Sequence, residues 1–245
     1  FNKMFVSDRR RRTEMEGIMK KILMILMVLM LVGCQNTQNE DASSSQDDTK
    51  QTEEITSNQT EKDQKILVAY FSRVGNTDFP SDVDTSSSAS VIVDGDTLIG
   101  STEYIANVIV EQTGGDKFLI ETQTKYSADY DELVDQQQGE RNKNARPALA
   151  SHVEDFDSYD VIYLGFPNWW YGMPMPLYTF LEEYDFSGKI IIPFNTSGGS
   201  GFSDAISEIE DLCPNATVLD GYTTSGSSVQ NDREEISEWI NEVSQ

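Results

Sequence analysis

Hydrophobic residues are unevenly distributed along the chain, and their spacing divides it into three parts. Residues 22–31 form one uninterrupted apolar run, and residues 35–64 are almost entirely polar. From residue 65 onwards, short apolar runs alternate with amphipathic stretches. Such alternation is typical of strands and helices that follow one another. Residues 65–245 are therefore predicted to form one α/β domain, and they are numerous enough for a well-filled core.

Five short apolar runs in this domain are predicted to be strands. They span residues 65–71, 117–122, 161–166, 189–195 and 216–219. The first run lacks polar alternation, which is expected of a strand buried on both faces of a parallel sheet. Helical spacing of apolar residues falls between the runs, over residues 102–112, 130–138, 175–183, 202–212 and 229–243. Strands separated by helices in this way indicate a doubly wound parallel sheet.

The connection after the first predicted strand is unusually long. Between Thr77 and Thr102 lie 24 residues, whereas loops that join a strand to a helix usually have roughly two to six. Within this segment, residues 89–93 and 96–99 can pair around Asp94-Gly95, a dipeptide that favours the tight type I′ turn. We predict a β-hairpin inserted at residues 78–101. A loop without regular structure is the alternative.

Loop segments that each contain glycine follow three of the predicted strands. They are Ser-Arg-Val-Gly-Asn-Thr at 72–77, Pro-Asn-Trp-Trp-Tyr-Gly at 167–172 and Asn-Thr-Ser-Gly-Gly-Ser-Gly at 195–201. Hydroxyls and backbone amides suit a phosphate, and aromatic faces suit a flat ring. Parallel sheets bind ligands at the carboxyl ends of their strands, where these segments lie. The segments are therefore the candidate binding site.

The first strand and its loop resemble the strand and phosphate loop of flavodoxin-like FMN proteins, and the two later loops extend this resemblance over residues 65–243. It implies a flavodoxin-like sheet with the strand order 2-1-3-4-5, in which strands one, three and four are neighbours. It also implies non-covalent binding of FMN. The cofactor-binding residues that it implies are Ser72, Arg73, Gly75, Asn76, Thr77, Pro167, Asn168, Trp169, Trp170, Tyr171, Gly172, Thr196, Ser197, Gly198, Gly199 and Ser200.

The first loop is expected to hold the phosphate of FMN. Ser72, Asn76 and Thr77 offer polar side chains, and Gly75 allows the backbone to approach closely. Arg73 adds a positive charge or points to solvent. The insertion delays the next helix, so that a hydroxyl residue at 101–102 is its expected cap, and the sequence leaves open which hydroxyls contact the phosphate.

The second and third loops are expected to surround the flavin ring. By resemblance, Trp169 and Trp170 lie closest to it, and at most two of the three consecutive aromatic residues can face one ligand. Pro167 and Asn168 would shape the second loop. Residues 196–201 would offer backbone amides to the polar edge of the ring. The alternative for this third loop is a turn from strand to helix without a ligand.

Groups for protein-based catalysis are scarce. His152 is the single histidine, which excludes a histidine-based metal cluster, and Cys213 is expected to be a half-buried apolar residue. No catalytic side chain is predicted, so the cofactor would supply the redox chemistry. Arg141 and Lys143 precede the third strand, and a contact of theirs with substrate is left open.

The first 34 residues are typical of a bacterial lipoprotein precursor. Met19 is the expected start, and two lysines lead into the ten apolar residues 22–31, too few for a membrane span of about 20. Residues 31–34 resemble a lipobox, so that Cys34 is the predicted lipidation site. Residues 1–18 would be upstream sequence and residues 35–64 a disordered acidic tether. The predicted location is the extracytoplasmic side of the bacterial cell membrane.

The charge and the motifs together limit the functions that this chain can have. Residues 65–245 contain 31 acidic and nine basic side chains, a net charge of −22, which argues against nucleic acid as a partner. We predict a membrane-anchored FMN-binding protein that transfers electrons to or from a redox protein or a small quinone-like acceptor. The alternative is an FMN-dependent NAD(P)H:quinone or nitro-compound oxidoreductase. A third hypothesis is a binding module without flavin.

Overall fold

A computed structural model describes residues 64–84 and 90–244. The predicted signal segment, Cys34 and all of the tether except Gln64 lie outside the described residues. Among the helices of the described part, none is long and apolar enough to cross a membrane.

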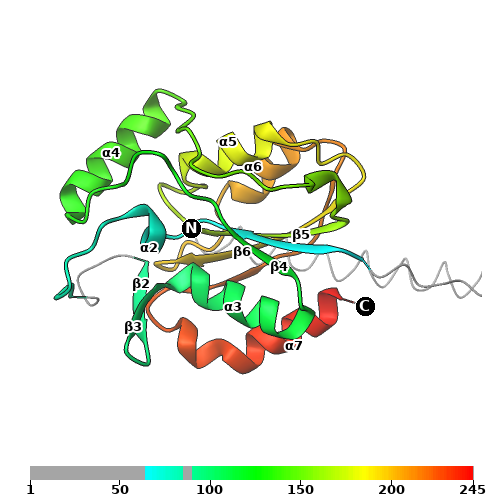
Figure 1. Ribbon diagram of the computed structural model, residues 1–245, viewed down its shortest axis with the longest axis horizontal. Coiled ribbons are helices and arrows are strands. Elements are labelled where there is room, and N and C mark those ends of the chain that lie inside the picture. The colour runs from blue at the N-terminus through cyan, green and yellow to red at the C-terminus, as the bar shows by residue number, and fades with distance from the viewer. Residues whose placement is uncertain (1–63, 85–89, 245) are drawn as a thin grey trace, which may run out of the picture. The chain divides into compact units, whose positions relative to one another are not determined.

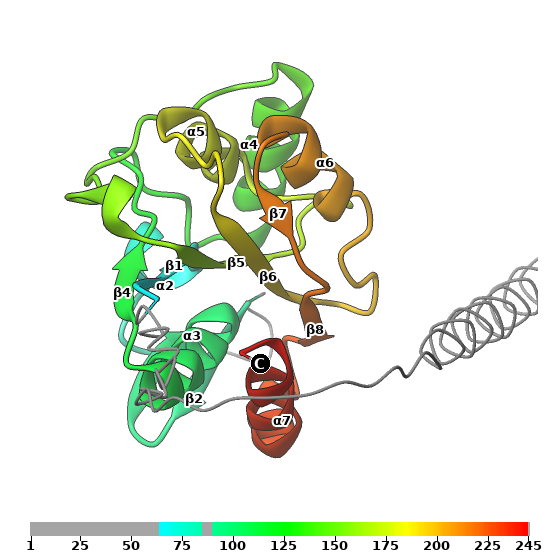
Figure 2. The same cartoon turned by 90° about the vertical axis from the view of Figure 1, so that its right-hand side faces the viewer.

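The domain is built on a parallel sheet. Its strands are β1 (Ile66–Tyr70), β4 (Asp116–Leu119), β5 (Val161–Pro167), β6 (Ile190–Ser197), β7 (Thr217–Val218) and β8 (Tyr222–Ser225). They lie in the order β4-β1-β5-β6-β7, with β8 also paired to β6, as Figure 2 shows. All of these pairings are parallel. Because β7 and β8 share the place of a fifth strand, the predicted order 2-1-3-4-5 is confirmed.

The helices cover both faces of the sheet (Figure 1). One face carries α4 (Tyr130–Asn142), α5 (Met175–Glu183) and α6 (Ala205–Leu212), and the other carries α3 (Ser101–Thr113) and α7 (Arg233–Val243). Alternate residues of β1 point to the two faces: Leu67 and Ala69 join the core under α5, and Val68 and Tyr70 join the core under α3. This two-sided burial explains why the first strand is apolar without alternation.

The last strand position is split because of Pro193 in β6. The carbonyls of Lys189 and Ile191 accept hydrogen bonds from the backbone amides of Thr217 and Leu219, so every second residue of β6 faces β7. Pro193 is the next residue of β6 that faces this neighbour. Proline has no N–H, and the ladder is interrupted there until Tyr222 pairs with Phe194. The prediction of a single strand at 216–219 therefore missed β8.

Two predicted helix boundaries also require correction. The helix predicted from residue 202 begins only at Ala205, because Gly201 and Ser203 have left-handed backbone angles with φ of 61° and 50°. The segment predicted as one helix at 229–243 is divided into a 3₁₀ turn, η2 (Val229–Asp232), and α7. A second 3₁₀ turn, η1 (Phe156–Ser158), precedes β5.

The predicted hairpin is present as β2 (Val91–Asp94) and β3 (Thr97–Gly100). Its turn is one residue later than predicted, because Asp94 pairs with Thr97 and leaves Gly95 and Asp96 as the loop. Of these two, only Gly95 has a positive φ, whereas a type I′ turn needs one at both positions. Ile92 and Ile99 pack into the core on the α3 side, so the insertion belongs to the folded domain.

Candidate functional site

The loops after β1, β5 and β6 meet at the carboxyl edge of the sheet, together with the start of α3. The amide of Asn168 donates to the carbonyl of Thr196 at 2.8 Å, which joins the second loop to the third. The hydroxyls of Thr102 and Thr196 lie 3.0 Å apart, which joins α3 to the third loop. The loop after β8 is a further neighbour, because the amide of Gly226 donates to Ser197.

Asn76 holds the first loop in place. Its buried amide nitrogen donates to the carbonyls of Ser72 and Ile120 at 2.9 and 3.0 Å. Its amide oxygen accepts bonds from the backbone N–H and the hydroxyl of Thr122 at 2.7 and 3.0 Å. Both amide hydrogens are therefore committed to the fold, and neither is left for a phosphate. The role predicted for Asn76 as a phosphate donor does not agree with this geometry.

Arg73 is buried and does not point to solvent. It belongs to α2 (Arg73–Asn76), a single irregular turn, and donates to the carbonyls of Ser127 and Ala128 at 3.2 and 3.3 Å. Its guanidinium also lies 4.8 Å from the centre of the Phe79 ring. Burial lowers the pKa of Arg73. The side chain thus connects the first loop to the segment before α4.

Gly75 and Thr77 differ in what they leave accessible to a ligand. Gly75 has a φ of 92°, and a Cβ there would overlap the side chain of Leu119, so this position requires glycine for the fold. The hydroxyl of Thr77 is buried and makes no hydrogen bond within the described residues. Of these two residues, Thr77 keeps a free polar group.

Two further buried hydroxyls lie where the hairpin leads into α3. The side chains of Ser72 and Ser101 belong to residues only 2% and 1% exposed, and neither hydroxyl has a hydrogen-bond partner in the part of the chain that the structure describes. A Cβ at Gly100 would overlap the Ser72 hydroxyl, so the end of the hairpin lies directly against the first loop. Ser101 is the first residue of α3, at the positive end of the helix dipole.

Sequence reasoning considered residues 101–102 only as a helix cap and did not name Ser101 as a ligand-binding residue. The available signal was a glycine followed by two hydroxyl residues at the start of an amphipathic helix. The loop after β8 was missed as well, because that strand was not predicted. A Cβ at Gly226 would lie 3.5 Å from the Ser101 hydroxyl and 3.6 Å from Thr196 Cβ.

The second loop forms a tight turn that displays two aromatic residues. Trp169 and Gly172 exchange backbone hydrogen bonds of 3.0 and 3.2 Å, and the two residues between them have φ of 54° and 63°. Positive φ at both central positions is the type I′ geometry, which normally selects Asn-Gly. Here Trp170 and Tyr171 occupy it, at a strain of about 1–3 kcal/mol each. Their side chains are 39% and 68% exposed.

Trp169 points into the core instead. Its ring packs edge-on against Phe71 and Tyr126, with centroids 5.2 and 5.6 Å away. The tyrosine is fixed in turn by a 2.8 Å bond from its hydroxyl to Glu140. Trp169 therefore supports the turn from the core. Of the two tryptophans predicted to lie closest to the flavin ring, only Trp170 is exposed.

The third loop is fixed at its ends and open in the middle. The Ser197 hydroxyl accepts bonds from the amides of Gly199 and Gly201 at 3.2 and 3.0 Å. Asn168 and Asn195 both donate to the carbonyl of Gly201, at 2.5 and 2.9 Å. A Cβ at Gly198 or Gly199 would meet no atom within 4 Å. Residues 198–200 thus border open space beside the aromatic turn.

The remaining predicted residues are part of the sheet or its edge. Pro167, the last residue of β5, pairs with Thr196 of β6, which places both backbones in the ladder. Cys213 is buried more completely than expected, and burial raises the pKa of its thiol to about 11, so it is a poor nucleophile. Within residues 64–84 and 90–244, no group of three or more histidine, cysteine or acidic side chains forms a metal site.

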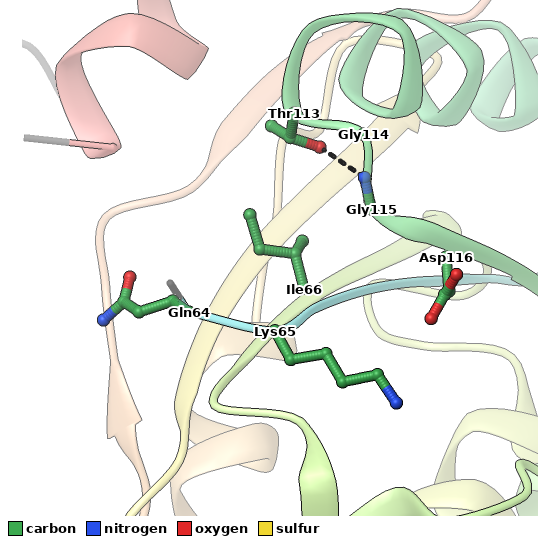
Figure 3. Close-up of a pocket in the computed structure, with 7 residues that line it drawn as sticks. All are labelled: Gln64, Lys65, Ile66, Thr113, Gly114, Gly115 and Asp116. Atoms are coloured by element: carbon green, nitrogen blue, oxygen red, sulfur yellow. Dashed lines mark hydrogen bonds between the residues drawn. The ribbon is translucent and has the colours of Figure 1, made fainter. Parts of the chain in front are cut away.

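A hollow of about 260 Å³ lies at the other edge of the sheet (Figure 3). Its lining residues are Gln64, Lys65, Ile66, Thr113, Gly114, Gly115 and Asp116. These residues belong to the amino ends of β1 and β4 and to the end of α3, where the Thr113 hydroxyl accepts a bond from Gly115 N–H. Parallel sheets bind their ligands at the opposite ends of the strands, so this hollow is not the candidate site.

Comparisons with known proteins agree with the fold. The family model described as Flavodoxin matches residues 90–243. Flavodoxin 1 of Escherichia coli K12 is 29% identical over 104 residues, which cover 38% of this chain and 59% of the relative. The flavodoxin of Haemophilus influenzae is 28% identical over 137 residues, 52% of this chain and 64% of the relative. The chain thus spans less than two thirds of these curated relatives.

Solved structures match over a longer range. A flavoprotein from Bacteroides uniformis is 32% identical, covers 73% of this chain and 98% of its own, and has a TM-score of 0.56. A flavoprotein from Bacteroides eggerthii is 27% identical, covers 71% and 98%, and has a TM-score of 0.51. The chain belongs to the flavodoxin family, the FMN-binding family that its sequence resembles.

Proposed function

We propose that this protein binds FMN non-covalently at the carboxyl edge of the sheet and transfers electrons. The observation that carries the proposal is the pair of buried hydroxyls of Ser72 and Ser101 without partners in the described residues. Buried polar groups are nearly always hydrogen-bonded in folded proteins, so these two suggest a ligand that accepts hydrogen bonds. A phosphate at the first turn of α3 meets this requirement.

The phosphate end of the cofactor would be held by hydroxyls and by the helix. Ser72, Thr77 and Ser101 supply hydroxyl groups that have no partner among the described residues. The backbone amide of Ser101 donates to Ser90, and the next amides in the first turn of α3 have no acceptor within the helix. Arg73 contributes positive charge from within the first loop although its guanidinium bonds elsewhere. Donors outnumber cations at this end, which suits a phosphate bound by hydrogen bonds.

The ring end would lie between the aromatic turn and the third loop. Trp170 offers a partly exposed aromatic face, and the open backbone of residues 198–200 offers N–H groups. When bound, FMN supplies the electron-transfer chemistry. The chain itself binds the phosphate, orients the ring beside the turn and limits access of water.

Two paired arginines favour an electron carrier over the NAD(P)H-dependent alternative. A reductase needs a site for a second, anionic nucleotide. The segment before β5 carries three cations, Arg141, Lys143 and Arg146, and the sequence left a substrate contact open for the first two. Arg141 is paired with Glu208 at 3.0 Å and Arg146 with Glu182 at 2.6 Å. The net charge of −22 on residues 65–245 also repels such a nucleotide. A basic redox protein or a neutral quinone-like molecule suits this surface better.

The proposed location is the extracytoplasmic face of the cell membrane, with attachment through lipid on Cys34. Support comes from the apolar run at 22–31 and the lipobox-like residues 31–34. Two or more acyl chains give stable attachment. Cys34→Ala is expected to move the protein from the membrane to the soluble fraction. Persistent membrane attachment of this variant would contradict the proposal.

The cofactor proposal is tested by titrating the purified protein with FMN and following flavin fluorescence and the visible spectrum. Saturable binding at one site per chain is expected, with stacking on the turn quenching the flavin. Absence of binding at saturating FMN would overturn the proposal. Adding NADH or NADPH without oxygen then separates the two functions, because only the reductase bleaches the flavin rapidly without a partner protein.

A further inference from the structure

An ion pair between two helices lies against the aromatic turn. Arg141 is in the last turn of α4, and Glu208 is in α6. Arg141 Nη2 and Glu208 Oε1 are 3.0 Å apart, and the two side chains are only 31% and 22% exposed. Despite its partial desolvation, the pKa of Arg141 is raised by the charge of Glu208. The pair thus joins elements that are distant in sequence.

The backbone of Gly172 rests on this ion pair. A Cβ at Gly172 would lie 2.7 Å from Arg141 Nη1 and 2.7 Å from Glu208 Oε2, closer than side-chain atoms normally approach. Those two atoms are buried, and the hydroxyl of Tyr178 lies beside the ion pair. The guanidinium and the carboxylate therefore fill the space beside the end of the turn, and only glycine leaves room for them.

The turn needs support because its backbone is strained. Trp170 and Tyr171 both have left-handed φ values, which bulky side chains rarely adopt and which persist only where the surroundings enforce them. One restraint is the amide of Asp204, which donates to the carbonyl of Tyr171 at 3.1 Å. The backbone amide of Glu208 donates to the carbonyl of Asp204 at 3.1 Å, so the same helix start carries this restraint and half of the ion pair.

We propose that Arg141 and Glu208 are positioning residues for the flavin-ring site, which hold the turn at 169–172 in its strained conformation. The inference rests on the proposed binding of FMN. Neither residue needs to touch the cofactor. They act through Gly172, and they fix where the Trp170 ring stands relative to the third loop.

The chain offers a matched control in a second ion pair. Arg146 and Glu182 of α5 form a bidentate pair with distances of 2.7 and 2.6 Å. Their side chains are 29% and 43% exposed. Arg146 is thus about as exposed as Arg141, and Glu182 is more exposed than Glu208. Glu182→Gln removes the same charge as Glu208→Gln, and it leaves the contacts of Gly172 unchanged.

Hydrogen exchange of the FMN-free protein tests the positioning itself. Glu208→Gln is expected to speed exchange at least fivefold at the amides of Trp169, Gly172 and Asp204, which all donate hydrogen bonds in or beside the turn. Glu182→Gln is expected to leave them unchanged. Equal exchange in the two variants would overturn the proposal. This arm does not depend on FMN binding.

FMN titration then tests the consequence for the ring site. Glu208→Gln is expected to weaken FMN binding about fivefold and to shift the visible bands of the bound flavin, and Glu182→Gln to do neither. Adding Arg141→Gln to Glu208→Gln should cause little further loss, since both changes break one interaction. Gly172→Ala should reproduce the effect and serves as a second test if Glu208→Gln unfolds.

The outcomes separate the two proposals. If the unaltered protein binds no FMN, the proposed function fails, and the exchange result alone describes the turn. If the unaltered protein binds FMN and Glu208→Gln binds it equally well with unchanged bands, the positioning role is overturned while the proposed function stands.

Discussion

The first loop and the start of α3 lie side by side at the carboxyl edge of the sheet, yet they use buried polar groups in opposite ways. Asn76 makes hydrogen bonds with every polar atom of its amide. Ser101 is equally buried, and its hydroxyl has no partner among the described residues. A saturated group holds the fold, and an unsaturated one suggests a missing ligand. Polar composition alone does not distinguish these roles.

The largest expected effect is the loss of the Asn76 amide. Asn76→Ala would leave Thr122 N–H and the carbonyl of Ile120 buried without partners, at about 1–3 kcal/mol each. We expect the free energy of unfolding of the FMN-free protein to fall by roughly 3 kcal/mol, measured by urea denaturation. Asn142→Ala, at an exposed position near the end of α4, is the control and should change it by less than about 0.5 kcal/mol. A similar small change at Asn76 would break the comparison.

The contrast between Asn76 and Ser101 also marks the limit of sequence reasoning. The partners of Asn76 include Thr122, which is 46 residues away, and no local pattern indicates that contact. The sheet order was predictable because buried strands and amphipathic helices have local signatures. The hairpin was predictable for the same reason. Whether a polar side chain is satisfied depends on tertiary contacts.

The aromatic residues 169–171 illustrate the same limit in another form. Three consecutive aromatic residues predict contact with a ring, but the backbone decides which way each one points. Trp169 packs in the core, and the left-handed angles at the next two residues turn their side chains outward. Such angles are unusual for bulky residues, so propensity argues against them. The division of the last sheet position into β7 and β8 could not be predicted either, because it depends on which neighbour of β6 Pro193 faces.

The second effect concerns the unsaturated group. Ser101→Ala is expected to weaken FMN binding about tenfold, since a charged phosphate would lose one donor worth about 1.4 kcal/mol. The FMN-free protein should be as stable as before, or slightly more stable, because no protein bond is lost. Fluorescence titration and urea denaturation measure the two quantities. Ser237→Ala, whose hydroxyl donates to the carbonyl of Arg233 within α7, is the control for affinity. If Ser101→Ala lowers stability and leaves FMN affinity unchanged, Ser101 holds the fold, as Asn76 does, and does not bind the phosphate.

The third effect concerns backbone strain at Trp170. Trp170→Asn places in the turn a residue that tolerates left-handed φ, so the FMN-free protein should gain about 1 kcal/mol of stability. FMN binding should weaken, because the aromatic face is lost. Tyr130→Asn removes another exposed aromatic residue whose φ is not left-handed, and it should give no such gain. If Trp170→Asn is destabilising, the turn is not strained by its side chains.

The smallest effect is expected where a polar group is satisfied but exposed. Hydrogen bonds from Arg146 hold the pKa of Glu182 below its usual range. A depressed carboxyl pKa stabilises the folded state above the unfolded pKa of about 4.3, and this contribution is lost as the pH falls through the folded value. Because the Glu182 side chain is 43% exposed, screening limits the contribution to less than about 0.5 kcal/mol.

The corresponding measurement compares Glu182→Gln with the unaltered FMN-free protein in urea, at neutral pH and near pH ~3. The unaltered protein should be slightly more stable at neutral pH, and the difference should shrink in acid as the Glu182 carboxylate takes up a proton. A satisfied group that is buried, such as Asn76, thus differs from a satisfied group at the surface by several-fold in energy. If Glu182→Gln lowers the free energy of unfolding as much as Asn76→Ala does, burial does not determine how much a hydrogen-bonded group contributes to stability.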